Sequence, residues 1–139
     1  RIQLKKISNW RNVRQKNAEI IFKSVADMPI VNIPSIKTYL NHAFYKCYLT
    51  INKDRLKKGW SRDRIILEIN KLGVRCFSGS CPEIYLEKSY KNFNISRLAN
   101  SKKLGEESLM FEVHPGLTKL EMQLKQSVIR SVLMKASLT

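Results

Sequence analysis

Thiol and imidazole groups are the side chains in this sequence that most readily suggest chemistry, as nucleophiles or metal ligands. Cys47, Cys76 and Cys81, with His42 and His114, could on paper form a zinc site or a Cys/His nucleophilic pair. Structural zinc sites pair their ligands at tight spacing such as C-x2-C, and a nucleophile needs a base beside it. The C-x4-C spacing here is too loose and the other groups are scattered. Ordinary half-buried cysteines and structural histidines are the preferred interpretation.

Residues 78–94 (SGSCPEIYLEKSYKNFN) form a long connection without clean periodicity, and long ordered connections are often functional. Gly79 lies in a Ser-Gly-Ser turn whose backbone N–H groups could face an anion, although a plain turn is the simpler interpretation. Glu83, Tyr85, Glu87 and Lys88 bring an acid, a phenol and an amine together, so contacts with a polar ligand are expected here first. The sequence contains neither G-x-G-x-x-G nor G-x-x-x-x-G-K-[ST].

Basic residues outnumber acidic ones by 26 to 11, which gives a formal charge of +15 and indicates an anionic partner. Nucleic acid, a phosphorylated ligand and an acidic neighbouring domain all fit this charge. The basic side chains are spread along the chain instead of lining one helix with interleaved aromatics, as a nucleic-acid platform prefers. The densest patch contains Lys53, Arg55, Lys57, Lys58, Arg62 and Arg64, and a solvated loop explains it equally well.

The length of 139 residues predicts a single domain, and the 43% of hydrophobic residues fits a globular fold. No apolar run approaches the roughly 20 residues that span a bilayer, and no signal peptide is visible. An odd number of cysteines, three, favours reduced thiols in a cytosolic protein. The chain opens on Arg1, already within a helical pattern, so we expect a fragment of a longer protein without a complete catalytic site.

Apolar residues at helical spacing predict a long amphipathic helix over residues 2–26, which Asp27 and two prolines end. An extended segment is expected at residues 30–33, and residues 44–51 (FYKCYLTI) have the composition of a strand. A second helix follows Ser61 as N-cap and ends at Gly73, before a short strand at residues 74–77.

The C-terminal half predicts a weaker helix at residues 95–104, ended near Gly105, and a third strand at residues 109–113. Thr118 and Glu121 form a T-x-x-E capping box for the last helix. Three short strands between helices predict an α+β domain, with a small antiparallel or mixed sheet covered by helices, on one face of the sheet.

Five segments of the chain, taken in order, resemble the C-terminal part of the DegT/DnrJ/StrS sugar aminotransferases, which depend on pyridoxal phosphate. The segments are residues 1–10 (RIQLKKISNW) running into 14–19 (RQKNAE), 42–48 (HAFYKCY), 59–65 (GWSRDRI), 78–88 (SGSCPEIYLEK) and 104–118 (LGEESLMFEVHPGLT). The similarity of each segment is weak alone, but the five segments occur in the family's order and cover nearly the whole chain. The stretch GSCPEIYLEK is similar to a branch that acts on nucleotide-linked or polysaccharide-precursor sugars.

The resemblance implies that residues 1–139 are one C-terminal small domain of a fold type I aminotransferase, normally a homodimer. The cofactor and its Schiff-base lysine belong to a large domain whose motifs are not matched here, so no cofactor, metal or catalytic residue is expected in this chain. The implied reaction moves an amino group, with glutamate as the expected donor, to a keto sugar attached to a nucleotide. The small domain closes over the active site and is inactive alone. The implied location is the cytoplasm, and neither a membrane nor a nucleic acid is an expected partner.

In many relatives the loop after the second strand carries a histidine- and tyrosine-containing motif that reaches the substrate. The matching positions here lack the histidine, so substrate contact and simple domain packing stay open as alternatives. The substrate-side residues that the resemblance implies are His42, Tyr45, Lys46, Arg75, Ser78, Ser80, Glu83 and Tyr85.

Two other functions compete with this hypothesis. A basic module that binds nucleic acid or another polyanion follows from the charge of +15 alone. A stand-alone hydrolase that uses Cys76, Cys81 or a histidine is the weakest of the three, because no base stands beside a nucleophile in the pattern.

Overall fold

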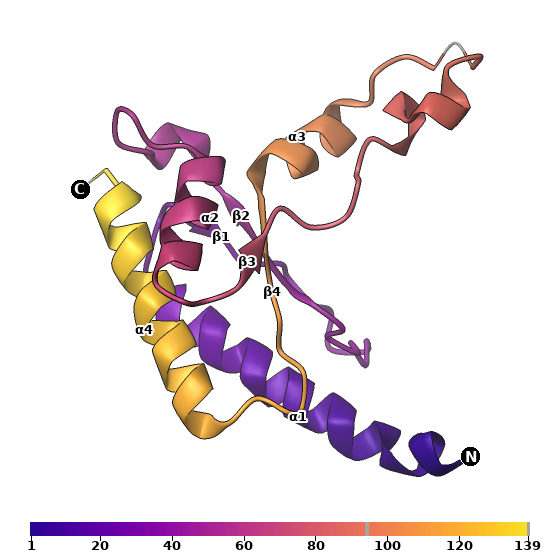
Figure 1. The fold of residues 1–139 in the computed structure, drawn as a ribbon, viewed down its shortest axis with the longest axis vertical. Helices are drawn as coiled ribbons and strands as arrows, with labels where there is room; N and C mark the ends of the chain where they lie inside the picture. Colours follow the sequence, from indigo (N-terminus) through magenta and orange to yellow (C-terminus); the bar gives the residue numbers. More distant parts are fainter. Residues whose placement is uncertain (94, 139) are drawn as a thin grey trace.

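A computed structural model describes residues 1–93 and 95–138, and it shows the predicted α+β arrangement (Figure 1). Short 3-10 turns η1, η2 and η3 occupy Lys53–Arg55, Ile84–Leu86 and Lys88–Tyr90. The helices are α1 (Ile2–Val25), α2 (Arg62–Lys71), α3 (Ala99–Glu107) and α4 (Lys119–Ala136). The strands are β1 (Val31–Asn32), β2 (Cys47–Ile51), β3 (Cys76–Phe77) and β4 (Ser108–Phe111).

The four strands form one antiparallel sheet in the order β1-β2-β4-β3. The prediction of about three strands missed β1, whose two residues pair with the far end of β2, Val31 opposite Ile51. Strand β4, the last in sequence, lies between β2 and β3. Both therefore run antiparallel to it and parallel to each other. Strand β4, from the C-terminal half of the chain, thus joins β2 and β3, the two strands that α2 connects.

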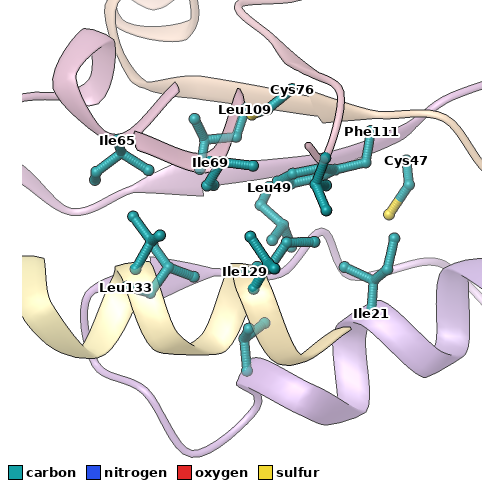
Figure 2. Packing of buried hydrophobic residues seen from close by; sticks show 14 of the residues in the cluster. Ile21, Cys47, Leu49, Ile65, Ile69, Cys76, Leu109, Phe111, Ile129 and Leu133 are labelled. Carbon is teal, nitrogen blue, oxygen red and sulfur yellow. The ribbon is translucent and has the colours of Figure 1, made fainter. Parts of the chain in front are cut away.

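One face of the sheet is covered by α1, α2 and α4, and the core lies between these layers (Figure 2). Strand β2 alternates buried Cys47, Leu49 and Ile51 with half-buried residues, as expected when one face packs on helices. Leu109 and Phe111 continue that face on β4, and α1, α2 and α4 each contribute aliphatic side chains to it. The helix residues labelled in Figure 2 are Ile21, Ile65, Ile69, Ile129 and Leu133, all fully buried.

Several helix boundaries follow from the predicted capping residues. Ser61 Oγ accepts a hydrogen bond from the N–H of Arg64 and begins α2, and Gly73 ends it with a φ of +79°. The capping box of α4 is present in both directions, with Thr118 Oγ1 and the Glu121 carboxylate each accepting from the other's backbone N–H. These local signals are readable from sequence because they involve residues only a few positions apart.

The strands expected at residues 74–77 and 109–113 are each off by no more than two residues at an end, as Cys76–Phe77 and Ser108–Phe111. Two other predicted elements have larger errors, each for a tertiary reason. The strand expected at residues 44–51 begins only at Cys47, because Phe44 takes a φ of +44° and Arg14 binds the carbonyls of Phe44 and Tyr45. The helix expected at residues 95–104 spans Ala99–Glu107 and continues through Gly105. A Cβ on Gly105 would lie 2.7 Å from Pro82 Cγ, so this glycine allows close approach of the chain and does not end the helix.

Residues 81–93 and 95–98, with the two turns η2 and η3, project from the sheet beside α3 (Figure 1). We call this segment the arm. Many of its apolar side chains are exposed. They are Ile84, Leu86, Tyr90, Phe93, Ile95 and Leu98. Among the described residues, no helix is long and apolar enough to cross a membrane.

Candidate functional site

Three of the eight predicted substrate-side residues gather around Glu112, at the end of β4. Cys47 and Cys76 both pair with Phe111, so the preceding residues Lys46 and Arg75 lie on either side of Glu112 in the neighbouring chain segments. Arg75 Nη1 lies 4.0 Å from Glu112 Oε1, and a small pocket of about 170 Å³ joins Glu112 to Tyr45 and Lys46. The tertiary structure therefore joins positions that are far apart in the sequence.

Arg14 of α1 positions Tyr45 in this group. Its Nη1 donates to the carbonyl oxygens of Tyr45 and Phe44, at 3.0 and 3.4 Å. The guanidinium carbon lies 5.6 Å from the centre of the Tyr45 ring, and Lys46 Nζ lies 5.4 Å from the same centre. Two cations thus lie over the ring, while the residue stays 74% exposed. Arg14 and Lys46 line the small pocket with Glu112, and Arg75 contacts the Glu112 carboxylate, so three basic residues stand near one acidic residue and the group favours an anionic ligand.

His42 lies apart from this group and has a structural explanation. Its Nδ1 accepts a hydrogen bond of 3.0 Å from the N–H of Phe44, and its ring meets the Phe44 ring edge-on at 4.3 Å. These contacts stabilise the left-handed turn that precedes β2. His42 lines a separate groove between α1 and residues 34–40.

Ser78 and Ser80 flank Gly79, which crosses the open face of the sheet. The turn passes directly over Tyr48 of β2, because a Cβ on Gly79 would lie 2.8 Å from Tyr48 Cε1. Ser80 Oγ lies 3.5 Å from the Tyr48 hydroxyl. Both serines are exposed, so their hydroxyl groups are accessible from outside the domain.

Glu83 and Tyr85 belong to the arm, where they bind Arg97 and Leu98 across the connection. Arg97 donates to both Glu83 oxygens, at 2.7 and 2.8 Å, and the Tyr85 hydroxyl donates to Oε1 at 2.8 Å. The N–H of Leu98 donates to the Tyr85 oxygen at 3.0 Å. The Arg97 guanidinium lowers the pKa of Glu83 to about 2, and burial together with the Glu83 bond raises the pKa of Tyr85. These two residues therefore fix the shape of the arm.

The residues of the candidate site that sequence reasoning missed are Arg14, Glu112 and Arg97. Arg14 lies in a helical pattern and Arg97 follows an irregular stretch, so neither stands out locally. Glu112 carried a usable signal, because it is a charged residue in an apolar strand segment (LMFEV). A polar residue at an alternate position of a half-covered strand lies on the open face.

The cysteines do not form the nucleophilic or metal site considered from sequence. Cys47 and Cys76 are buried on opposite sides of Phe111, and burial raises the pKa of each thiol to about 12. Cys81 is exposed, and its contact with Glu87 raises its pKa. Within residues 1–93 and 95–138, no three His, Cys, Asp or Glu residues are grouped so as to hold a metal.

The densest basic patch, in residues 53–64, is partly neutralised by its own neighbours. Lys53 Nζ binds Glu106 at 2.6 Å, and Arg62 binds Asp63 at 2.7 Å. Arg64 lies over the Trp60 ring, 4.5 Å from its centre. This pairing weakens the argument for nucleic acid that the charge of +15 raised from sequence.

Comparison with known proteins gives the context for this geometry. The sequence model of the DegT/DnrJ/EryC1/StrS aminotransferase family matches residues 1–132. An aminotransferase from Psychrobacter cryohalolentis is 42% identical, with a TM-score of 0.91 over 97% of this chain. The aminotransferase TlmJ from Streptoalloteichus hindustanus (16% identity, TM-score 0.84, 96% of this chain) shares the fold. So does DesV of S. venezuelae (13% identity, TM-score 0.82, 95% of this chain), which was solved with a ketimine intermediate.

This chain spans 37% of the Psychrobacter protein and 34% of both TlmJ and DesV. A search of the curated proteins found no match.

Proposed function

Because the chain belongs to the DegT/DnrJ/EryC1/StrS aminotransferase family, we propose that it forms the small, C-terminal domain of a pyridoxal-phosphate-dependent enzyme. That enzyme transfers an amino group, with glutamate as the donor, to a keto sugar attached to a nucleotide. Its product serves polysaccharide or cell-surface sugar synthesis in the cytoplasm. The observation that carries the proposal is the 42% identity to the Psychrobacter aminotransferase across 97% of this chain.

Pyridoxal phosphate supplies an electron sink for amino transfer when it is bound. Such a site combines a lysine with a free carboxylate and several donors for the phosphate. The buried lysine that borders a cavity here is Lys125, but the two carboxylates beside it are engaged: Glu121 by Thr118 and Glu112 by Arg75. No Ser or Thr side chain is among the described residues that line this cavity. These residues do not fit the cofactor, so we place it in a large domain beside this one.

The role of this chain is to bind and orient the anionic part of the substrate. Arg14 and Lys46 supply positive charge at the exposed ring of Tyr45, which can stack on a base or sugar. Arg75 adds a third positive charge beside Glu112. Ser78 and Ser80 offer hydroxyl groups from the turn over Tyr48. The domain closes over the active site with the large domain, within a homodimer, and excludes water from the reacting groups.

The test follows formation of 2-oxoglutarate from glutamate by the enzyme that contains this chain, with nucleotide-linked keto sugars as acceptors. We expect turnover with these sugars and none from the 139-residue chain alone. Arg75→Gln should raise KM for the nucleotide sugar by about tenfold, because a charged hydrogen bond is lost, and should leave KM for glutamate unchanged. Arg55→Gln, a change in the loop that follows β2, is the matched control.

Absence of transamination with every nucleotide-linked keto sugar would overturn the proposed reaction. Turnover with an unchanged KM in both variants would instead remove Arg75 from the substrate side. The competing polyanion hypothesis predicts binding to a generic DNA duplex with a steep dependence on salt, and negligible binding near physiological salt would eliminate it.

A further inference from the structure

A second cavity lies on the other side of Glu112, between the first turns of α4 and the turn that joins α2 to β3. Its volume is about 280 Å³. Lys125 and Arg75 provide two basic groups in its lining, beside Glu112, His114 and Glu121. Lys125 is only 5% exposed, whereas the Arg75 side chain is 74% exposed. One cation thus lies deep in the domain and the other lies at the surface.

The Lys125 ammonium lacks a charged partner within the described part of the chain. Its Nζ donates to the carbonyl oxygen of Glu112 at 2.8 Å, which satisfies one of three N–H donors. The carboxylate of Glu121 accepts from the N–H and the hydroxyl of Thr118, both at 2.7 Å. The Glu112 carboxylate faces Arg75. Neither carboxylate forms an ion pair with Lys125.

Burial of this ammonium has an energetic consequence. Desolvation lowers the pKa of Lys125, and the charges of Glu112 and Glu121 oppose that shift only in part. A buried charge is costly unless a counter-charge and further hydrogen bonds accompany it. The nearby thiols of Cys47 and Cys76 cannot supply that charge, because burial keeps them protonated. An anion in the cavity would supply both the counter-charge and acceptors for the remaining N–H groups.

We propose that this cavity binds a small oxyanion, a carboxylate or a phosphate group, with Lys125 at its base and Arg75 at its rim. The contact with Glu112 involves only Nη1 of Arg75, so the guanidinium keeps its other N–H donors for such a ligand. The volume lies just below the range of about 300–1,000 Å³ that is typical of small-molecule sites, which limits the ligand to a compact molecule. This inference goes beyond amino transfer and does not depend on it.

The test measures binding of inorganic phosphate and of acetate by isothermal titration calorimetry, with chloride at equal ionic strength as the reference. A ligand at ~100 times its Kd should raise the thermal unfolding midpoint of the protein by roughly 5–10 °C. Lys125→Met should weaken binding by at least about tenfold. It should also unfold at the same or a higher temperature than the parent without ligand, since a buried unpaired charge has been removed.

Lys135→Met is the matched control, because it removes the same charge from an exposed position of α4. It should bind like the parent protein. Arg75→Gln, at the exposed rim, should weaken binding several-fold without affecting folding. Binding of phosphate alone would identify a phosphate site, and binding of acetate alone a carboxylate site. Binding no stronger than that of chloride, or equal binding by the parent, Lys125→Met and Arg75→Gln, would overturn the proposal.

Discussion

At the scale of single residues, two glycines hold left-handed turns for different reasons. Gly73 has a φ of +79°, and a Cβ there would meet nothing within 4 Å. Gly79 has a φ of +95°, and its Cβ would also press against the Tyr48 ring at 2.8 Å. The first position demands only backbone freedom, whereas the second demands that freedom and the absence of a side chain. An alanine substitution at each glycine can therefore separate the cost of the backbone conformation from the cost of the steric contact.

We predict that Gly79→Ala lowers the free energy of unfolding more than Gly73→Ala does. The positive φ costs each variant about 1–2 kcal/mol, and overpacking against Tyr48 adds about 1–3 kcal/mol at Gly79 alone. Urea unfolding followed by circular dichroism measures both values. Equal losses would mean that the turn moves away from Tyr48 without cost. In that case Gly79→Ala should also change the NMR signals of Tyr48 and Ser80.

At the scale of elements, the arm owes its shape to one charged cluster more than to apolar packing. Its apolar side chains are largely exposed, while Glu83 is joined to Arg97 and Tyr85 by three hydrogen bonds. The close fit of Pro82 against Gly105 attaches the base of the arm to α3. The arm is therefore expected to depend on the ionisation of Glu83.

We predict that the order of the arm is lost at low pH. The pKa of Glu83 is lowered from 4.5 to about 2, mainly by Arg97. A carboxyl group with a lowered pKa stabilises the folded arm fully above pH 4.5, and this contribution disappears as the pH falls through about 2. NMR titration of the Glu83 side-chain carbonyl carbon measures the pKa directly. Arg97→Gln should return it toward 4.5, whereas Lys88→Gln should leave it low. A Glu83 pKa near 4.5 in the unmodified chain would contradict this account.

At the scale of the whole molecule, the sheet is covered on one face, and the N-terminal turns of α1 extend beyond the core (Figure 1). Leu4, Ile7 and Trp10 follow one another at helical spacing. The first two are 67% and 56% exposed, and Trp10 lines a groove of about 390 Å³ with Ala43 and Tyr45. Phe22, further along α1, does not belong to this stripe, because its ring centre lies 6.0 Å from that of Phe44 and the side chain packs against the core.

We predict that the 139-residue chain self-associates through this N-terminal stripe, since exposed contiguous apolar surface favours association. Sedimentation velocity should show a weight-average sedimentation coefficient that rises with protein concentration. The double variant Leu4→Glu/Ile7→Glu should remain monomeric. Leu120→Glu is the matched control, because Leu120 is 74% exposed on α4, away from the stripe. A parent chain that stays monomeric at the highest soluble concentration would refute the prediction.

Much of this fold and little of the candidate site could be predicted from the sequence. The long first helix, the Ser61 cap and the capping box of α4 are encoded by residues within one or two turns of each other. Strand β1 was expected only as an extended segment, because two residues are too few to show the alternation of buried and exposed positions that marks a strand. The eight substrate-side positions came from the family resemblance, and they lie in separate groups. Tyr45, Lys46 and Arg75 meet at Glu112, whereas Glu83 and Tyr85 lie in the arm.

The sequence by itself determined the helices, their caps, the basic charge and the family, because these depend on local spacing and on residue order. The tertiary structure alone decided which distant residues meet. Strand β4 enters between β2 and β3, and this register places Lys46 and Arg75 on either side of Glu112. It likewise places the Lys125 ammonium beneath that strand end, against the Glu112 carbonyl. Pairing between strands and helices far apart in the chain follows from burial of one shared core, which no local pattern specifies.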